Sequence, residues 1–185
     1  MTEYKGTKGG AVQNFEEDPG NPYVGQVWYN ETTGNLRVRQ TTLTSAWASG
    51  GNLNTARKRT GGAGTQTAAL AFGGFSPPSD VVAITESYNG SSWTEVNDLQ
   101  TARSQGGGTG ATNTAAIYFG GFIQPGANSA LTELWNGTNW TEVNDLNTAR
   151  RNMGPFGTST SAISATGGPP VIGNVESWNG TNWTE

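Results

Sequence analysis

The stretch WNGTNWTEVNDLNTARR at residues 135–151 is almost a copy of YNGSSWTEVNDLQTARS at 88–104, and its first letters return as WNGTNWTE at 178–185. A period of roughly 20 to 50 residues is typical of folds built from stacked units. Successive Thr-Ala-Arg triplets are 46 and 47 residues apart, and successive Gly-Gly pairs are 47 and 47 apart. We therefore predict repeats of about 47 residues, at 47–93, 94–140 and 141–185.

Several residue types recur in a fixed order within the repeats. An arginine ends each Thr-Ala-Arg triplet, a Gly-Gly pair follows a run of small or apolar residues, and a tryptophan follows each Asn-Gly. Because a residue placed by a repeat plays the role of that repeat, we assign structural roles to these positions. They are Arg57, Arg103, Arg150, Trp47, Trp93, Trp140, Trp183, Gly73, Gly74, Gly120, Gly121, Gly167 and Gly168.

The composition favours many short β-strands. Of the 185 residues, 33% are hydrophobic, 28 are glycine and seven are tryptophan. A chain rich in Gly, Thr, Asn and Ser and poor in strong helix formers is typical of strands joined by tight turns. We predict an all-β fold.

Each repeat divides into four strands. The run GTQTAALAFGG (64–74) contains a continuous apolar segment, which predicts a strand buried on both faces. AITESYNG (83–90) and SSWTEV (91–96) follow as the third and fourth strands, and the Asn-Gly between them predicts a two-residue hairpin turn. One such sheet cannot bury both faces alone, so we expect the repeats to stack as the blades of a β-propeller do.

These features resemble kelch-type propeller repeats. The resemblance rests on the arginine of each triplet, the glycine clusters GGAG (61–64) and GGGTG (106–110), the Gly-Gly pairs and the paired aromatic residues, and it covers 47–185. It implies kelch-like blades, of which the chain holds about three and a half, whereas such propellers usually close with about six or seven. We expect a fragment of a longer protein; the alternative is that several copies cover the open edges.

The sequences of the repeats and of the N-terminal region are similar to those of structural proteins of tailed phages, marine ones in particular. These carry kelch-like repeats behind a short attachment segment. The resemblance implies an extended attachment arm at 1–22 and a β-hairpin segment at 23–46. In the latter, GQVWYNETTGNLRVRQ (25–40) alternates with period two around the turn ETTG (31–34).

The chain contains no cysteine and no histidine. This removes thiolate chemistry, the commonest zinc ligands and the Ser-His and Cys-His nucleophiles, so we expect no cofactor and no enzyme activity. The net charge of −4 and the lack of a long basic run argue against nucleic acid as a partner. No apolar stretch has the length of a signal peptide or a membrane span, so we expect a chain made in a cytoplasm without membrane insertion.

Three repeated sets have a functional interpretation beside the structural one. The arginines could form a basic ligand-binding ring, but we expect them to bond carbonyls or a carboxylate between neighbouring blades. Glu86, Glu133 and Glu176 could be glycosidase carboxylates, but one acid per repeat does not provide two differently tuned carboxyl groups around one cleft. The tryptophans could stack on sugars, but we expect packing between blades.

Six Asn-x-Ser/Thr sequons are interpreted as turn chemistry rather than glycosylation sites. They begin at Asn30, Asn89, Asn136, Asn139, Asn179 and Asn182.

The segments after the Gly-Gly pairs differ between repeats and read FSPPSDVVAI, FIQPGANSAL and PPVIGNV. Variation in a repeat fold maps to loops on one face, which is often the binding face. We predict partner contacts there, the alternative being tolerant surface loops. The predicted contact residues are Phe75, Pro77, Asp80, Phe122, Gln124, Pro125, Asn128 and Pro170.

From the phage resemblance we expect a non-enzymatic virion structural protein, a tail fibre or appendage, assembled in the host cytoplasm. The arm at 1–22 would dock to other virion proteins or to its own copies, since fibres are commonly oligomers. The kelch-like region would be a rigid binding or spacer module for host attachment, with a surface receptor or glycan as a partner. One alternative is a carbohydrate-active propeller enzyme, although the copper chemistry of the kelch-type oxidase would need His and Cys ligands. The other is a cellular kelch-like adaptor.

Overall fold

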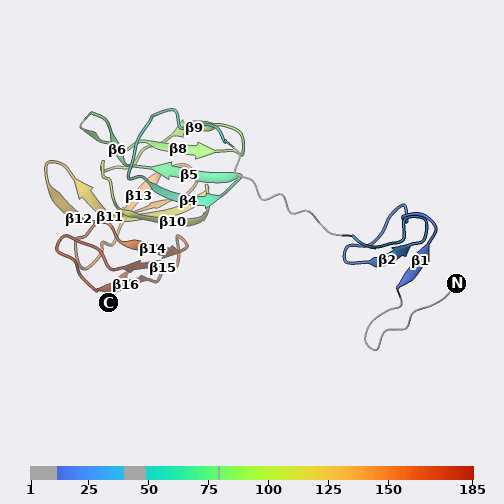
Figure 1. Cartoon of the computed structure of the whole chain (residues 1–185). Helices are drawn as coiled ribbons and strands as arrows, with labels where there is room; N and C mark the ends of the chain where they lie inside the picture. The colour runs from blue at the N-terminus through green and yellow to red at the C-terminus, as the bar shows by residue number, and fades with distance from the viewer. Residues whose placement is uncertain (1–11, 40–48, 79) are drawn as a thin grey trace. The chain divides into compact units, whose positions relative to one another are not determined.

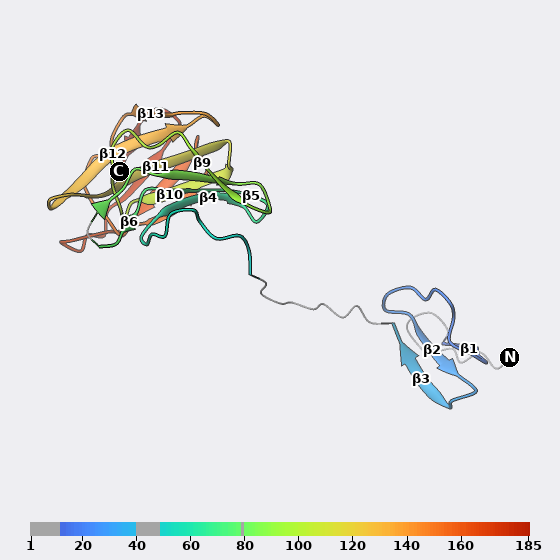
Figure 2. The same ribbon diagram turned by 90° about the horizontal axis from the view of Figure 1, so that it is seen from above.

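The computed structural model describes residues 12–39, 49–78 and 80–185 (Figures 1 and 2). Trp47, residues 1–11 of the predicted arm and residues 40–46 of the predicted hairpin segment lie outside these residues. The chain divides into two compact units, Met1–Ala48 and Ser49–Glu185. The described parts of both contain strands and no helix, so the predicted all-β class is confirmed.

The first unit contains a three-stranded sheet of β1 (Gln13–Phe15), β2 (Val27–Asn30) and β3 (Asn35–Val38). β2 and β3 pair antiparallel across residues 31–34, which is the hairpin that the alternating sequence predicts. β1, within the predicted arm, pairs parallel to β2. Trp28 is buried, and its indole Nε1 donates to the Asp18 carboxylate at 3.0 Å.

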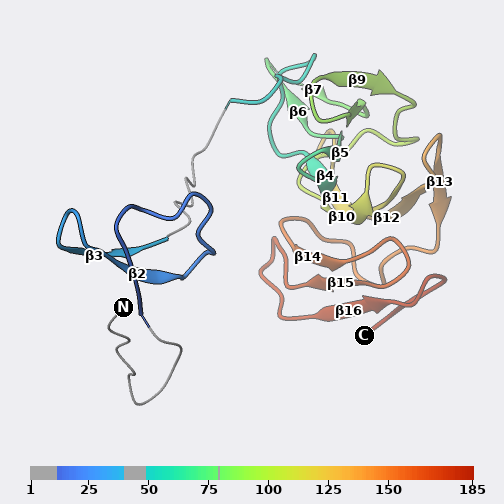
Figure 3. The same ribbon diagram turned by 90° about the vertical axis from the view of Figure 1, so that its right-hand side faces the viewer.

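The second unit contains three four-stranded antiparallel sheets, each a meander in chain order, here called sheets 1, 2 and 3 (Figure 3). Sheet 1 comprises β4 (Gly61–Thr65), β5 (Ala68–Phe72), β8 (Thr85–Tyr88) and β9 (Trp93–Val96). Sheet 2 comprises β10 (Gly107–Thr112), β11 (Ala115–Ile123), β12 (Ala127–Trp135) and β13 (Trp140–Val143). Sheet 3 comprises β14 (Gly154–Gly157), β15 (Ala162–Ala165), β16 (Val175–Trp178) and β17 (Trp183–Thr184). A short pair, β6 (Phe75–Ser76) and β7 (Asp80–Val81), extends the first loop.

Two apolar clusters join the sheets. In the first, Leu70 and Phe72 of sheet 1 pack against Tyr118 and Trp140 of sheet 2. In the second, the same relation recurs one sheet along, and its buried members are Ile117, Phe119, Leu146, Met153, Ala162, Trp178 and Trp183. Because side chains alternate along a strand, sheet 2 uses one face toward sheet 1 and the other toward sheet 3. None of the described sheets closes on itself.

The hairpins at the Asn-Gly pairs have four-residue loops, so the predicted two-residue turn is wrong. Tyr88 pairs with Trp93, which leaves residues 89–92 as the loop. Only Gly90 takes a positive φ, of 95°. The Asn89 side-chain oxygen accepts hydrogen bonds from the backbone N–H groups of Ser91 and Ser92 at 2.9 and 3.0 Å. The asparagine thus serves as a loop cap, and Asn136 and Asn179 repeat this geometry.

The third Gly-Gly pair is displaced by one residue from the other two. Gly61 pairs with Phe72, whereas its counterpart Gly154 pairs with Ala165. Thr166 therefore occupies the position of Gly73 in sheet 1, and its φ of 63° matches the 61° of Gly73. Equivalent positions in the repeats are defined by the backbone register and not by the Gly-Gly pair itself. In the third repeat the 47-residue spacing of the pairs therefore does not connect structurally equivalent residues.

Gly120 lies where two repeats approach each other closely. Its φ is 62°, and a Cβ built there would lie 2.5 Å from Met153 Cε and 2.6 Å from the Arg150 carbonyl oxygen. We expect Gly120→Ala to lower the free energy of unfolding by about 2 kcal/mol or more, from steric overlap and backbone strain. Urea denaturation checks this. Gly126→Ala, with no atom within 4 Å of the added carbon, is the control, with an expected change within about 0.5 kcal/mol; equal effects would contradict the close approach.

Candidate functional site

The repeated arginines and glutamates form three buried ion pairs. Their N···O distances are 2.6 Å for Arg57–Glu86, 2.7 Å for Arg103–Glu133 and 2.9 Å for Arg150–Glu176. Each pair lies within one repeat, so the expectation of an arginine side chain bonded between neighbouring repeats is wrong. In each case the arginine precedes the first strand of a sheet and the glutamate lies on the third strand of that sheet.

The backbone of two of these arginines, Arg103 and Arg150, reaches the preceding sheet. The Arg103 carbonyl accepts a hydrogen bond from the Gly74 N–H at 3.0 Å, and the Arg150 carbonyl accepts one from the Gly121 N–H at 2.8 Å. The arginine thus joins two sheets, through its side chain on one side and its carbonyl on the other. The preceding glycines, Gly73 and Gly120, allow this because a Cβ on either would lie within 2.6 Å of the arginine carbonyl oxygen.

The carboxylates are further bonded by the segment that enters each sheet. Glu133 accepts from the backbone N–H of Gln100 at 2.8 Å, and Glu86 accepts from that of Asn54 at 2.7 Å. Their side chains are fully buried. A carboxylate whose oxygens are bonded by an arginine and a backbone amide, out of contact with solvent, is not placed to exchange a proton with a substrate.

Tyr118 of sheet 2 is a second buried polar side chain in this region. Burial raises its pKa to about 12, despite the opposing effect of the nearby Arg103 guanidinium. Its hydroxyl accepts from the Gly106 N–H at 3.2 Å, and Arg103 stacks on its ring at 4.7 Å. Tyr118 therefore stays protonated at neutral pH and serves the packing between sheets 1 and 2.

Trp140 and Trp183 lie between sheets. Trp140 on β13 packs edge-to-face on Phe72 with ring centroids 4.8 Å apart, and its Nε1 donates to the Thr85 hydroxyl at 3.0 Å. Trp183 has the same contacts one sheet along, with Phe119 and Thr132. Neither ring is available to stack on a sugar. Trp93 is only half-buried, and its Nε1 donates to the Gly51 carbonyl within its own repeat.

The three variable loops lie side by side. The Gln124 side-chain oxygen accepts from the Val81 N–H at 3.4 Å, which links the second loop to the first. The Asn128 side-chain amide donates to the Pro169 carbonyl at 2.8 Å, which links the second loop to the third. All eight predicted contact residues are exposed or half-buried. The structure thus brings them together as one row of loops over three sheets.

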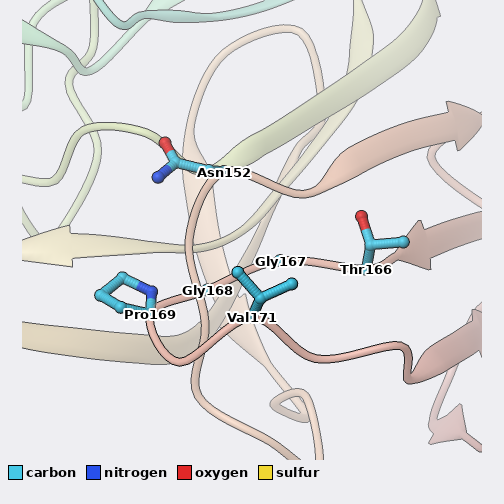
Figure 4. A pocket seen from close by; sticks show the side chains of 6 residues that line it. All are labelled: Asn152, Thr166, Gly167, Gly168, Pro169 and Val171. Carbon is cyan, nitrogen blue, oxygen red and sulfur yellow. The ribbon is translucent and has the colours of Figure 1, made fainter.

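A pocket of about 420 Å³ lies beside the third loop. Its lining comprises Asn152, Thr166, Gly167, Gly168, Pro169 and Val171 (Figure 4). Neither Asn152 nor Thr166 is among the contact residues predicted from the sequence. The sequence signal that could have indicated Asn152 is its repeat position, two residues after Thr-Ala-Arg. In the structure the residues at this position, Arg59, Gln105 and Asn152, all have positive φ. These residues are joined in series, since the Gln105 N–H donates to the Arg59 carbonyl and the Asn152 N–H donates to the Gln105 carbonyl.

Within residues 12–39 of the first unit, polar side chains gather around Asp18. The carboxylate accepts from the Trp28 indole and, at 2.8 Å, from the Asn30 side-chain amide, and Arg37 lies 3.8 Å away. Hydrogen bonds from Trp28 and Asn30, with a smaller contribution from Arg37, lower the pKa of Asp18. The cluster fixes the irregular segment 16–26 onto the sheet.

Within residues 12–39, 49–78 and 80–185, no three His, Cys, Asp or Glu side chains gather as metal ligands. The same part of the chain contains no helix with the length and apolar character of a membrane span. No protein-family model matches the sequence, and a search of curated proteins found no match.

Proposed function

We propose that this chain is a non-enzymatic binding or spacer module, built of kelch-like propeller blades, in the tail fibre or another appendage of a tailed phage. One observation carries the non-enzymatic part. The repeated charged and aromatic side chains of sheets 2 and 3 are committed to packing and bonding within and between the sheets. The side chains that differ between repeats form one continuous row of exposed loops.

The row of loops supports the binding role. Loops on a rigid scaffold are the usual place for recognition, because they vary without disturbing the packed sheets. Here the loops are joined by the Gln124 and Asn128 hydrogen bonds, so they present a preorganised surface. A host surface receptor or glycan is the proposed partner of this surface. Residues 1–22 are the proposed docking segment toward other virion proteins.

A carbohydrate-active enzyme is the less favoured alternative. Glycosidic cleavage needs two carboxyl groups flanking the substrate in different environments. The repeated glutamates are fully buried and each is bonded to its own arginine. A cellular kelch-like adaptor would bind its partner through the same loops. The two roles therefore differ in whether the chain is part of the virion.

Labelling of purified virions tests this proposal. Antibodies raised against the purified chain are applied to phage particles from its source, and gold labelling is viewed by electron microscopy. We expect label on the tail or its appendages. Particles that carry no label, and no peptide of this chain by mass spectrometry, would contradict the virion role and favour a cellular adaptor.

A further inference from the structure

The two interfaces between sheets are built from the same parts. Each preceding sheet offers a face with a phenylalanine ring and a threonine hydroxyl, as Phe72 and Thr85 do in sheet 1; we call this the receiving face. Each following sheet inserts a tryptophan into it, as Trp140 of sheet 2 does. We call the side that carries this tryptophan the inserting face. Phe119, Thr132 and Trp183 repeat the arrangement between sheets 2 and 3.

A short entering segment completes each inserting face. It runs from a leucine to the arginine of Thr-Ala-Arg. The N–H of Leu99 donates to the Ala83 carbonyl of the preceding repeat, and that of Leu146 donates to the Ala130 carbonyl. Both leucine side chains are buried, at 4% exposure. The segment therefore fills the space above the Gly-Gly pair of the preceding sheet.

The receiving face of sheet 3 has no sheet upon it among the residues that the structure describes. The register places Phe156 opposite Ile163, and Ala165 opposite Val175, on this one face. Phe156 is 60% exposed, Ile163 42% and Val175 48%. The pocket lined by Thr166 and Gly167 (Figure 4) lies at the position that the entering segment fills in the two earlier sheets. An apolar face and an adjoining pocket are thus open together.

The inserting face of sheet 1 is open in the complementary way. Its entering segment, LNTAR at 53–57, is identical in sequence to LNTAR at 146–150, which fills the space above the Gly-Gly pair of sheet 2. Leu53 and Trp93 are only half-buried, whereas their counterparts in sheets 2 and 3 are buried. Within the second unit, Ser49–Glu185, no described sheet precedes sheet 1.

In sheet 3, Ala165 stands at the position of Phe72 and Phe119, so its receiving face lacks that phenylalanine ring. The exposed Phe156 and Ile163 supply its apolar surface instead. In sheet 3, Val175 stands where Thr85 and Thr132 accept a tryptophan N–H, so no hydroxyl is present at that position. In sheet 1, the Trp93 N–H donates to the Gly51 carbonyl at 3.0 Å and needs no outside acceptor. Trp93 can therefore pack on an apolar face without leaving a polar group unpaired.

We propose that the receiving face of sheet 3 binds the inserting face of sheet 1 in a second copy of this chain. Leu53 and Trp93 of the second copy lie on Phe156, Ile163 and Val175, and its residues 53–57 enter the pocket. The contact is head-to-tail, so two copies close it into a ring of six sheets if the rotation permits, and longer chains form if it does not. The proposal rests on the packing of the sheets and is independent of the virion role.

Thr166 leaves less room for an entering segment on sheet 3 than the glycines leave on sheets 1 and 2. Thr166 stands at the position of Gly73, where an added Cβ would lie 2.5 Å from the Arg103 carbonyl oxygen. The carbonyl of an entering Arg57 must therefore sit further out above Thr166 than Arg103 does above Gly73. Thr166→Gly removes this crowding and is expected to lower the dissociation constant of the pair.

Sedimentation velocity over a range of protein concentrations is the test. The unmodified chain is expected to sediment as a species of at least twice 19.3 kDa at the higher concentrations. Ile163→Asp, on the receiving face, and Leu53→Asp, on the inserting face, are each expected to raise the dissociation constant about a hundredfold by burying a charge in an apolar contact. Thr141→Asp, at an exposed position on β13 of the middle sheet, is the matched control and leaves association unchanged.

A mixture of the two blocked chains makes the test specific. Each variant keeps one intact face, so an equimolar mixture is expected to form a 1:1 heterodimer, which also shows that both variants are folded. A contact of sheet 3 with sheet 3 would instead be lost in Ile163→Asp, kept in Leu53→Asp and not rescued by mixing. That result, or a monomeric unmodified chain at all concentrations, overturns the proposal and leaves the open face to further repeats or another protein.

Discussion

Replacement of Arg103 by methionine is expected to lower the free energy of unfolding of the second unit by about 3–5 kcal/mol. The guanidinium is fully buried, 2.7 Å from Glu133, and also donates to the Tyr118 carbonyl at 3.1 Å. Removing it leaves the Glu133 carboxylate in the interior with a backbone N–H but without its countercharge. Such an uncompensated charge costs far more than the net contribution of the pair itself. Urea denaturation followed by far-UV circular dichroism measures the change.

The double variant Arg103→Met/Glu133→Leu is the control for this interpretation. With both charges removed, no unpaired group remains buried, and we expect at least half of the lost stability to return. Arg37→Met serves as a surface comparison, because Arg37 and Asp18 lie 3.8 Å apart with both side chains 45% exposed. It should change the free energy of unfolding of the first unit, in which both residues lie, by less than about 1 kcal/mol. If Arg103→Met has an effect as small as this, the pair is not buried in solution.

The sequence predicted the repeat and the division of each repeat into four strands, because both depend on local pattern. The apolar run in 68–72 and the Asn-Gly signal placed β5, β8 and β9 correctly. The pairing of the arginines is a property of three-dimensional packing, so spacing alone left it open. Arg103 and Glu133 are 30 residues apart and meet only because β12 lies in the interior of sheet 2.

Two local details were wrong for a common reason. The Asn-Gly signal fits a two-residue turn, but the Asn89 side chain bonds the backbone N–H groups of two later residues and stabilises a four-residue loop. The third Gly-Gly pair fits the spacing, but Thr166 takes the left-handed conformation expected of the first glycine. In both cases the residue pair adopts a conformation other than the one in which it is most often found. Hydrogen bonds determine which conformation forms, and these cannot be seen in the sequence.

The row of loops could be predicted from the sequence, whereas the pocket could not. Variation between repeats predicted the loops, since their sequences diverge after each Gly-Gly pair. It did not identify Asn152, whose part in the pocket follows from its place after Gln105 in the series of backbone hydrogen bonds. Asn152 lines the pocket because, among the described residues, no further repeat continues this series of hydrogen bonds beyond sheet 3.

Replacement of Trp140 by alanine is expected to cost about 3–5 kcal/mol of unfolding free energy, as is usual when a large buried aromatic side chain is deleted. The indole is 4% exposed and lies between sheets 1 and 2, against Phe72 on one side and Trp135 on the other. Its loss removes ring packing and leaves the Thr85 hydroxyl without its donor. Trp140→Phe keeps much of the packing and should cost less, about 1–3 kcal/mol.

Trp93→Ala is the matched comparison, because Trp93 occupies the same repeat position on sheet 1 but is only half-buried. At low protein concentration it should cost clearly less than Trp140→Ala, since it removes the tilted contact with Tyr88 and one hydrogen bond to Gly51. If a second copy covers Trp93, the cost of Trp93→Ala rises with protein concentration, whereas that of Trp140→Ala does not, because only the first depends on association. Equal costs at low concentration would mean that the position in the repeat, rather than the presence of a preceding sheet, determines what each tryptophan contributes.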